Sequence, residues 1–422
     1  MAENNQPESI FQKFTNAIDR HFNYIVISII SIQVLKGVAL YETAYARGQY
    51  IWSYSEGFIK RGFIGTLALF FEGNDHYRIL GIINFFSYFF YFLLIFLLYR
   101  FIINNAQTIM QKAMAILLLS SPFLIAMGAL LGYFDLLILS LLLIIYNFCD
   151  KKDIPALPYF FLVTIAIMIH EMSLFFLVLP LLYLIWMHPI ASLRKKYFLI
   201  GSSLLLCAIY LLFISRQNIA FTKVLDERIS EYKHILSTKS GEKFFEFYTG
   251  YALKNSFLQD FKVPRLGMLI VLLPIYGFFI LMSNWIVLPE LLKTKKYKDV
   301  LFYLAACYAP LLIIIVGWDA DRFVCDGIIT AYISFLIITK SYPAIIEKRP
   351  GKMQWVLIGT LSIAALLTYY PISDNYGEAQ TLISKDKQKI LLQYPDKIIT
   401  SWKNLVAPKK NMPLPTEDQQ GK

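Results

Sequence analysis

The chain has 422 residues, of which 57% are hydrophobic, 16% aromatic and only 16% charged, and its formal net charge is +11. A soluble protein carries about 25% charged residues, so the composition excludes a string of soluble domains. The positive charge does not indicate nucleic-acid binding, because the lysines and arginines lie in short segments between apolar runs instead of in one patch. An integral membrane protein is the class that remains.

Apolar runs of helical length predict an all-α fold, a polytopic transmembrane helical bundle of roughly eleven spans. We expect them at about residues 23–41, 79–101, 113–130, 133–149, 158–170, 172–187, 197–214, 266–288, 299–316, 324–340 and 353–370. Leu131-Gly132-Tyr133 is a very tight turn between two of them. The stretch 159–187 is either one long tilted helix or two short helices hinged at His170-Glu171.

The distribution of lysine and arginine predicts the orientation of the spans, because cytoplasmic loops carry an excess of both. With the N-terminus inside, the inner loops hold seventeen such residues between Lys13 and Lys352. The short outer loops hold five: Arg47, Lys60, Arg61, Arg78 and Arg322. This asymmetry also favours two spans within 159–187, because an undivided helix would place Lys293–Lys298 outside.

Two longer polar segments then face outward. Residues 215–265 show apolar side chains at helical spacing among charges, which predicts amphipathic helices on the membrane surface. We expect residues 1–370, including the outer loops 42–78 and 215–265, to form one transmembrane body, and 371–422 to form an extracytoplasmic C-terminal tail.

The first outer loop is too hydrophobic for a free linker. From Gly57 to Phe71 it is apolar enough to enter the membrane interface and too short to cross it, which predicts an interfacial or re-entrant helix. Lys60 and Arg61 would then lie at the level of lipid head groups. They either extend their charges to water or bind the phosphate of a lipid-linked substrate. Glu56 either pairs with Lys60 or acts as a general base.

Further ionisable residues lie at the predicted outer ends of spans, where a charge is costly without a partner or a task. Asp135 begins a span, where it either caps the helix or opens into an outer cavity beside Glu56. The pair His170-Glu171 interrupts an apolar stretch and is a candidate for substrate binding. A zinc site there is not expected, because no second histidine or cysteine lies at ligand spacing.

The segment from Gly317 to Asp326 is the densest charged cluster at a span end. Its charged residues are Asp319, Asp321, Arg322 and Asp326. If Arg322 points at a phosphate, the surrounding carboxylates would fix its orientation. The Asp-x-Asp spacing also resembles a metal–nucleotide site, but nucleotide sugars are not available outside the cytoplasm.

Together, these features resemble the GT-C superfamily of integral-membrane glycosyltransferases. The segment Glu42-Thr43-Ala44-Tyr45-Ala46-Arg47 resembles the acidic–aromatic sequence that follows the first span in that superfamily, with Glu56 as a second candidate for its acidic residue. Asp135 resembles an acidic position at the start of a later span. The usual paired acidic residues of the first loop are absent here, which leaves Glu42 and Glu56 as alternatives for the base.

The resemblance implies transfer of a sugar from a polyprenyl-phosphate carrier to a glycan or lipid acceptor on the extracytoplasmic face, with no cofactor or metal required. The expected partners are the lipid-linked donor, the acceptor and membrane lipids, with no nucleic acid. A bacterial inner membrane is the expected location. An O-antigen- or capsule-type polymerase is the alternative. A transporter or flippase is less favoured, because transporters place charges near the membrane midplane.

Overall fold

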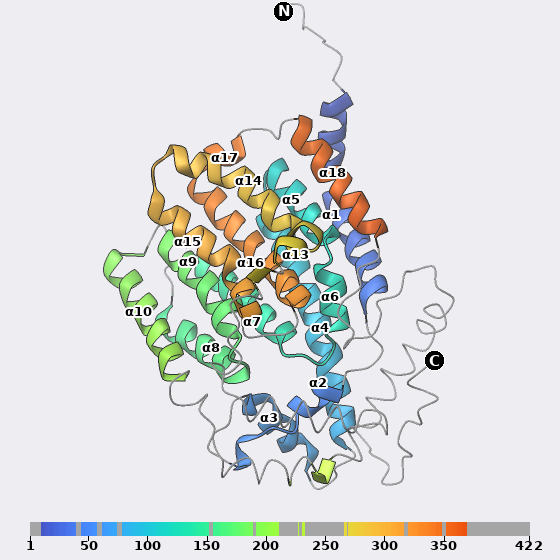
Figure 1. Cartoon of the computed structure of the whole chain (residues 1–422), viewed down its shortest axis with the longest axis vertical. Coiled ribbons are helices and arrows are strands. Elements are labelled where there is room, and N and C mark those ends of the chain that lie inside the picture. Colours follow the sequence, from blue (N-terminus) through green and yellow to red (C-terminus); the bar gives the residue numbers. More distant parts are fainter. Residues whose placement is uncertain are drawn as a thin grey trace, which may run out of the picture.

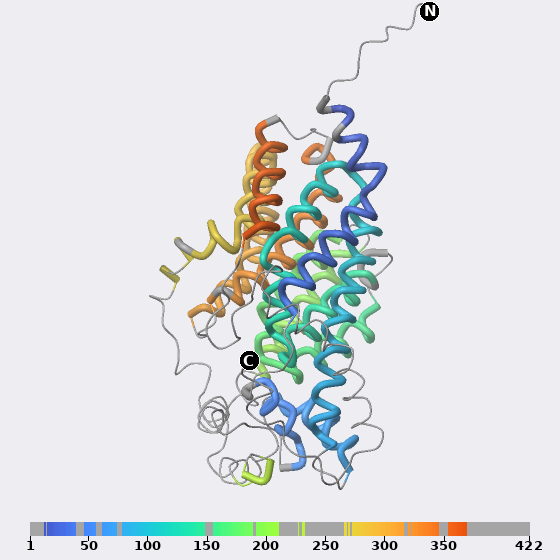
Figure 2. The backbone as a smooth tube through the Cα atoms, turned by 90° about the vertical axis from the view of Figure 1, so that its right-hand side faces the viewer, coloured from blue at the N-terminus to red at the C-terminus, as the bar shows by residue number. Residues whose placement is uncertain are grey.

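The protein is described here by a computed structural model, which covers residues 10–38, 44–56, 61–73, 78–151, 155–188, 191–210, 227, 230–232, 266–267, 269–315, 320–347 and 352–368. Over these residues the regular structure is helical throughout. Most of the helices run side by side in an elongated bundle (Figures 1 and 2). One end carries α2 and α3, and the other carries α17 and the start of α1 (Figure 1). We call these the α3 end and the α17 end.

The N-terminal part of the described chain, up to residue 151, begins with one long helix and a group of short elements at the α3 end. Its elements are α1 (Ile10–Gly37), α2 (Ala44–Gln49), η1 (Tyr54–Glu56), α3 (Gly62–Glu72), α4 (Arg78–Asn105), α5 (Ile109–Ser120), α6 (Phe123–Ala129) and α7 (Asp135–Lys151).

The helices after residue 155 complete the same bundle. They are α8 (Ala156–Ile169), the π-helical turn η2 (Leu174–Val178), α9 (Leu179–Met187), α10 (Leu193–Ile209), α13 (Leu269–Ile275), α14 (Phe278–Lys293), α15 (Tyr297–Tyr308), the 3-10 helix η5 (Ala309–Ile315), α16 (Ala320–Ser341), α17 (Ala344–Glu347) and α18 (Lys352–Leu367).

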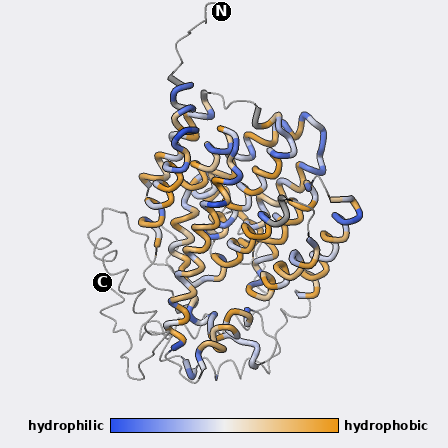
Figure 3. Tube along the Cα trace, turned by 180° about the vertical axis from the view of Figure 1, so that it is seen from behind, coloured by the Kyte–Doolittle hydropathy of each residue, from blue (hydrophilic) through white to orange (hydrophobic). Residues whose placement is uncertain are grey.

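The bundle has the composition of a membrane protein. Within the described residues, four helical segments are long and apolar enough to cross a membrane: Arg78–Asn105, Ile109–Ala129, Tyr297–Ile315 and Arg322–Ser341. Hydrophobic residues dominate the helices of the bundle in Figure 3. Large apolar side chains such as Phe96 and Leu205 are exposed on its outside, as expected where lipid covers a helix. A helix lies within each of the eleven predicted spans, but the number that cross stays a prediction.

The predicted tight turn and hinge are both confirmed. Gly132 has a φ of 90°, and the Tyr133 N–H donates to the Leu130 carbonyl oxygen at 2.9 Å, which closes the turn between α6 and α7. At the hinge, α8 ends at Ile169 and His170 adopts an extended conformation.

Proline divides spans that we predicted to be continuous. Pro122 separates α5 from α6, because it lacks the N–H that would continue the helix. The carbonyl groups left at the end of α5 accept hydrogen bonds from a side chain of α1. Gln33 Nε2 donates to the carbonyl oxygens of Leu119, Ser120 and Ser121 at 3.2, 2.7 and 3.2 Å. Pro274 precedes the break between α13 and α14, and Pro310 lies where α15 continues as the 3-10 helix η5.

Helix α16 is the centre of the bundle. It is almost entirely buried and packs against α5, α6, α9, α14, α15 and η5. Its first turns carry Arg322 and Asp326, so two predicted site residues stand on a helix that is almost entirely enclosed.

Helix α3 supports the α3 end through one apolar face. Ile64 and Ala68 are buried, whereas Phe70 is 80% exposed on the opposite side. Eleven residues span about 16 Å, which is too short to cross a bilayer and confirms that the first loop contains a short apolar helix. Glu72 at its end is buried and accepts hydrogen bonds from the Tyr232 hydroxyl at 2.8 and 3.0 Å.

Gly65 permits the close approach of α3 to the segment before it. A Cβ added there would lie 1.8 Å from the carbonyl oxygen of Trp52. We therefore expect Gly65→Ala to displace α3 and to lower the free energy of unfolding by about 1–3 kcal/mol. Thermal unfolding of the purified protein in detergent measures the change. Gly201→Ala is the matched control, because an added Cβ at that helical position meets no atom within 4 Å. Equal stability of the two variants would contradict this packing.

Candidate active site

A buried ion pair joins the start of α3 to the hinge between α8 and η2. Arg61 Nε donates to Glu171 Oε1 and Oε2 at 3.1 and 3.0 Å, and its Nη2 makes a further short contact with Oε1. The two side chains are only 8% and 9% exposed. This geometry fixes the plane of the guanidinium group, which a lysine ammonium could not do.

The local backbone explains how Arg61 reaches this position. Arg61 adopts the left-handed conformation, with φ 63° and ψ 10°, directly before α3 begins at Gly62. Few residues other than glycine take this conformation, so the ion pair and the surrounding packing hold it in place. Its guanidinium carbon also lies 5.9 Å from the ring centroid of the buried Trp52. Arg61 is therefore buried against protein and does not extend its charge to water, which was one of the two predicted alternatives.

His170 is buried beside this pair, and a backbone hydrogen bond fixes the orientation of its ring. Its Nδ1 accepts the backbone N–H of Met172 at 3.0 Å, so the proton of the neutral ring is on Nε2. The 3.5 Å separation between this Nδ1 and Glu171 Oε2 is therefore a contact between an acceptor and a carboxylate, and Glu171 is paired with Arg61. His170 and Glu171 are neighbours in the sequence, but the charge partner of Glu171 is Arg61 at the start of α3.

Two tyrosines that the sequence did not single out lie in the same region. Tyr54 is half-buried in η1, and its hydroxyl makes a long contact of 3.5 Å with the carbonyl oxygen of Met168. Burial raises the pKa of Tyr54 to about 12, which keeps its hydroxyl protonated as a donor at neutral pH. Tyr210, at the end of α10, is buried and interacts electrostatically with Glu171 and Arg61. Tyrosine is common in this chain, so its identity alone gave no signal.

A second buried ion pair joins α7 to α16. Arg322 Nη2 contacts Asp135 Oδ2, and the two side chains are 4% and 0% exposed. The guanidinium carbon lies 4.7 Å from the ring centroid of Tyr133 and 5.4 Å from that of Phe323. Asp135 therefore does not open into a solvent-filled cavity, contrary to one of the two predictions, because its carboxylate is enclosed with Arg322. This carboxylate also comes from a distant helix, not from the acidic residues adjacent to Arg322 in the sequence.

Aromatic contacts connect the elements that carry the two ion pairs. Tyr50, two residues before Trp52, packs edge-on against Phe134, whose ring centroid is 5.1 Å away. Phe176 of η2 packs at 6.3 Å from Phe323, the neighbour of Arg322. Helix α16 also contacts both η2 and η5. Residues far apart in the sequence thus form one framework toward the α3 end of the bundle (Figure 1).

The remaining predicted site residues are placed only in part. Asp326 is fully buried, one turn after Arg322 on α16. Glu56 lies in η1 and Asp321 in the first turn of α16, but their side chains fall outside the described structure. Glu42, Lys60 and Asp319 also lie outside the described residues, as do the predicted C-terminal tail and nearly all of 215–265. The choice between Glu42 and Glu56 as base stays open.

Comparisons with protein-family models, with curated proteins and with solved structures found no match for this chain. The fold and the site define a helical protein with membrane-spanning character and paired charges inside its apolar bundle. In the described residues, no three histidine, cysteine or acidic side chains are grouped to hold a metal ion.

The pair between Asp135 and Arg322 gives a stability prediction. Arg322→Ala leaves a carboxylate buried without its cation, so we expect it to lower the free energy of unfolding by about 3–5 kcal/mol. Replacing both residues, in Asp135→Leu with Arg322→Met, should recover most of that loss. Unfolding in detergent measures both variants.

The exposed pair of Lys293 and Glu290 provides the control for this measurement. The Lys293 side chain is 65% exposed, so Lys293→Ala should change the free energy of unfolding by at most about 1 kcal/mol. An Arg322→Ala variant as stable as Lys293→Ala would contradict the buried pair.

Proposed function

We propose that this protein is a membrane glycosyltransferase. It would move a sugar from a polyprenyl-phosphate-linked donor to a cell-envelope glycan or lipid acceptor on the extracytoplasmic face, in a bacterial inner membrane. The observation that carries the proposal is the arginine–carboxylate framework built by Arg61, Glu171, Asp135 and Arg322. It brings together, toward one end of an apolar bundle, charges that the sequence distributes over four separate segments.

The distribution of basic residues along the bundle supports the proposed orientation in the membrane. Lys112 contacts Asp19 of α1, and Lys340 contacts Asn105 at the end of α4, so basic residues of several predicted inner loops meet at the α17 end. Cytoplasmic segments are rich in lysine and arginine. The α3 end would then face the extracytoplasmic side, where lipid-linked sugars serve as donors.

The position of Arg61 supports a phosphate-bearing lipid as donor. Arg61 immediately precedes α3, whose residues Leu67, Phe70 and Phe71 are exposed and apolar. A polyprenyl chain can lie along such a surface while its phosphate reaches the helix start. Arginine suits this position because a guanidinium group has five N–H donors, so it can pair with Glu171 and bind a phosphate oxygen at the same time.

The reaction follows from these groups. The acceptor hydroxyl oxygen attacks the anomeric carbon of the donor, and the bond between that carbon and the phosphate oxygen breaks. Glu56 or Glu42 takes the hydroxyl proton as general base. Polyprenyl phosphate leaves, and Arg61 with Lys60 stabilises its added negative charge in the transition state. His170 and Glu171 orient the acceptor and Arg61. The buried residues Asp135, Arg322 and Asp326 hold α7 and α16 together beside the site.

Asp319 and Asp321 lie shortly before Arg322 in the sequence, and we propose that they contribute to acceptor binding. The scheme requires no metal ion, because cationic side chains already neutralise the leaving phosphate.

Transfer from a radiolabelled polyprenyl-phosphate-sugar pool, in membranes that hold equal amounts of each variant, tests this function. We expect either Glu56→Gln or Glu42→Gln to lower transfer by about 100- to 10,000-fold, because one of them removes the general base. Arg61→Lys keeps the charge but loses the planar donors, so we expect it to lower transfer by about 100-fold.

Glu290→Gln is the matched control, because it makes the same chemical change at the α17 end and should leave transfer unchanged. Unchanged transfer in the Glu42, Glu56 and Arg61 variants, or none with the unaltered protein, would contradict the proposal. Long polymeric products, in place of single additions, would identify a polymerase.

A further inference from the structure

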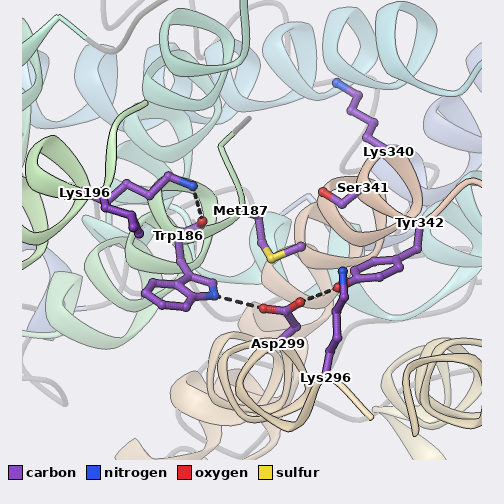
Figure 4. A pocket seen from close by; sticks show the side chains of 9 residues that line it. Trp186, Met187, Lys196, Lys296, Asp299, Lys340, Ser341 and Tyr342 are labelled. Atoms are coloured by element: carbon purple, nitrogen blue, oxygen red, sulfur yellow. Dashed lines mark hydrogen bonds between the residues drawn. The ribbon is translucent and has the colours of Figure 1, made fainter. Parts of the chain in front are cut away.

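A cavity of about 470 Å³ lies at the end of the bundle opposite the candidate active site. Its polar lining includes Trp186, Lys196, Lys296, Asp299, Lys340 and Tyr342 (Figure 4). These residues come from the end of α9, the start of α10, the connection before α15, the first turn of α15 and the end of α16. We call this cavity the lysine pocket. The transfer reaction proposed above uses none of its residues.

The lysine pocket has an excess of positive charge, with three lysines and one carboxylate in its lining. The carboxylate of Asp299 is engaged by neutral donors. Trp186 Nε1 donates to its Oδ1 at 3.0 Å, and the Tyr342 hydroxyl donates to its Oδ2. Figure 4 shows this chain of two hydrogen bonds along one wall. Asp299 therefore holds Trp186 and Tyr342 in place, and none of the ion pairs found among the described residues involves its carboxylate.

Two of the ammonium groups are held by uncharged groups beside the cavity. Lys196 Nζ donates to the carbonyl oxygen of Trp186 at 2.7 Å, and Lys296 Nζ lies 4.9 Å from the ring centroid of Tyr342. The ion pairs found among the described residues involve neither of these lysines. Burial lowers the pKa of Lys196, and the negative charge of Asp299 opposes that shift. An anion in the pocket would offset the same cost of desolvation.

Contacts within the protein hold the walls of the pocket in place. The ring of Trp186 stacks on Phe302, with centroids 4.8 Å apart and planes at 16°. Lys340 Nζ lies 3.3 Å from both Asn105 Oδ1 and the Tyr146 hydroxyl, which connects its position to α4 and α7. A preformed site loses less entropy on binding.

One edge of the pocket is apolar and lies at the surface of the bundle. Leu193 lines the pocket and is 64% exposed. On the same helix, Tyr197 and Leu204 are exposed one and three turns further along. A ligand that combines a negative head with an apolar tail matches this arrangement better than a wholly polar anion.

We propose that the lysine pocket binds the phosphate head group of an anionic lipid from the membrane leaflet at the α17 end. Lys196, Lys296 and Lys340 would bind the phosphate oxygens, and the acyl chains would lie against Leu193 and the exposed face of α10. Basic pockets between membrane helices are suited to such head groups. The shared chemistry is a phosphate group, so free phosphate is the other possible source.

Binding of phosphatidylglycerol to the detergent-solubilised full chain, followed by native mass spectrometry, tests this proposal. We expect bound phosphatidylglycerol and no comparable binding of phosphatidylcholine, whose head group is neutral overall. The triple variant Lys196→Gln, Lys296→Gln, Lys340→Gln should bind phosphatidylglycerol about 10- to 100-fold more weakly. Asp299→Asn removes the only carboxylate of the described lining, so it should bind the lipid more tightly than the unaltered protein.

The matched control is Lys293→Gln, Lys295→Gln, Lys298→Gln, which removes the same charge from exposed lysines nearby. An equal loss of binding in both triple variants would overturn the proposal, because it would show a general surface attraction. Displacement of the lipid by millimolar inorganic phosphate would show that the pocket binds free phosphate, and would overturn the proposal that it binds a lipid. If the first triple variant does not fold, weaker binding by Asp299→Asn would overturn the proposal.

Discussion

Charges enclosed in an apolar bundle must be neutralised, and this requirement organises the structure. Removing a charge from water costs several kcal/mol unless a partner compensates. Arg322 meets Asp135, Arg61 meets Glu171, and Lys36 of α1 donates to backbone carbonyl oxygens at the end of α18, including those of Leu366 and Thr368 at 2.9 Å each. Each contact joins segments distant in the sequence, so neutralisation also fixes which helices lie together.

The two ends of the bundle use different cations. Toward the α3 end, arginines form directional pairs with carboxylates, whereas at the α17 end lysines line a cavity with neutral partners. A guanidinium group binds its partner in a fixed planar geometry, whereas an ammonium group is a point charge on a flexible side chain. This difference is consistent with our two proposals, in which the arginines orient a reacting phosphate and the lysines bind a lipid head group. Both proposals depend on one orientation of the bundle in the membrane.

The positions of the helices were predicted from the sequence better than the residue pairs that connect them. Apolar runs located a helix in every expected span, and the polar pair at His170-Glu171 correctly marked a break. The division at Pro122 was missed, because the apolar pattern continues through it. Glu171 was predicted as a site residue, but its pairing with Arg61, 110 residues away, could not be read from one sequence. For the same reason Asp135 was considered open to a cavity, although it is enclosed with Arg322.

The most direct test of this account is the orientation of the two ends. Ser55 near the α3 end and Ser341 at the α17 end are both exposed, and each can be replaced by cysteine in a chain from which Cys149, Cys207, Cys307 and Cys325 have been removed. A membrane-impermeant maleimide applied to intact bacterial spheroplasts should label Ser55→Cys, and it should label Ser341→Cys only after the membrane is made permeable. The reverse pattern would place the arginine–carboxylate framework in the cytoplasm and contradict an extracytoplasmic active site.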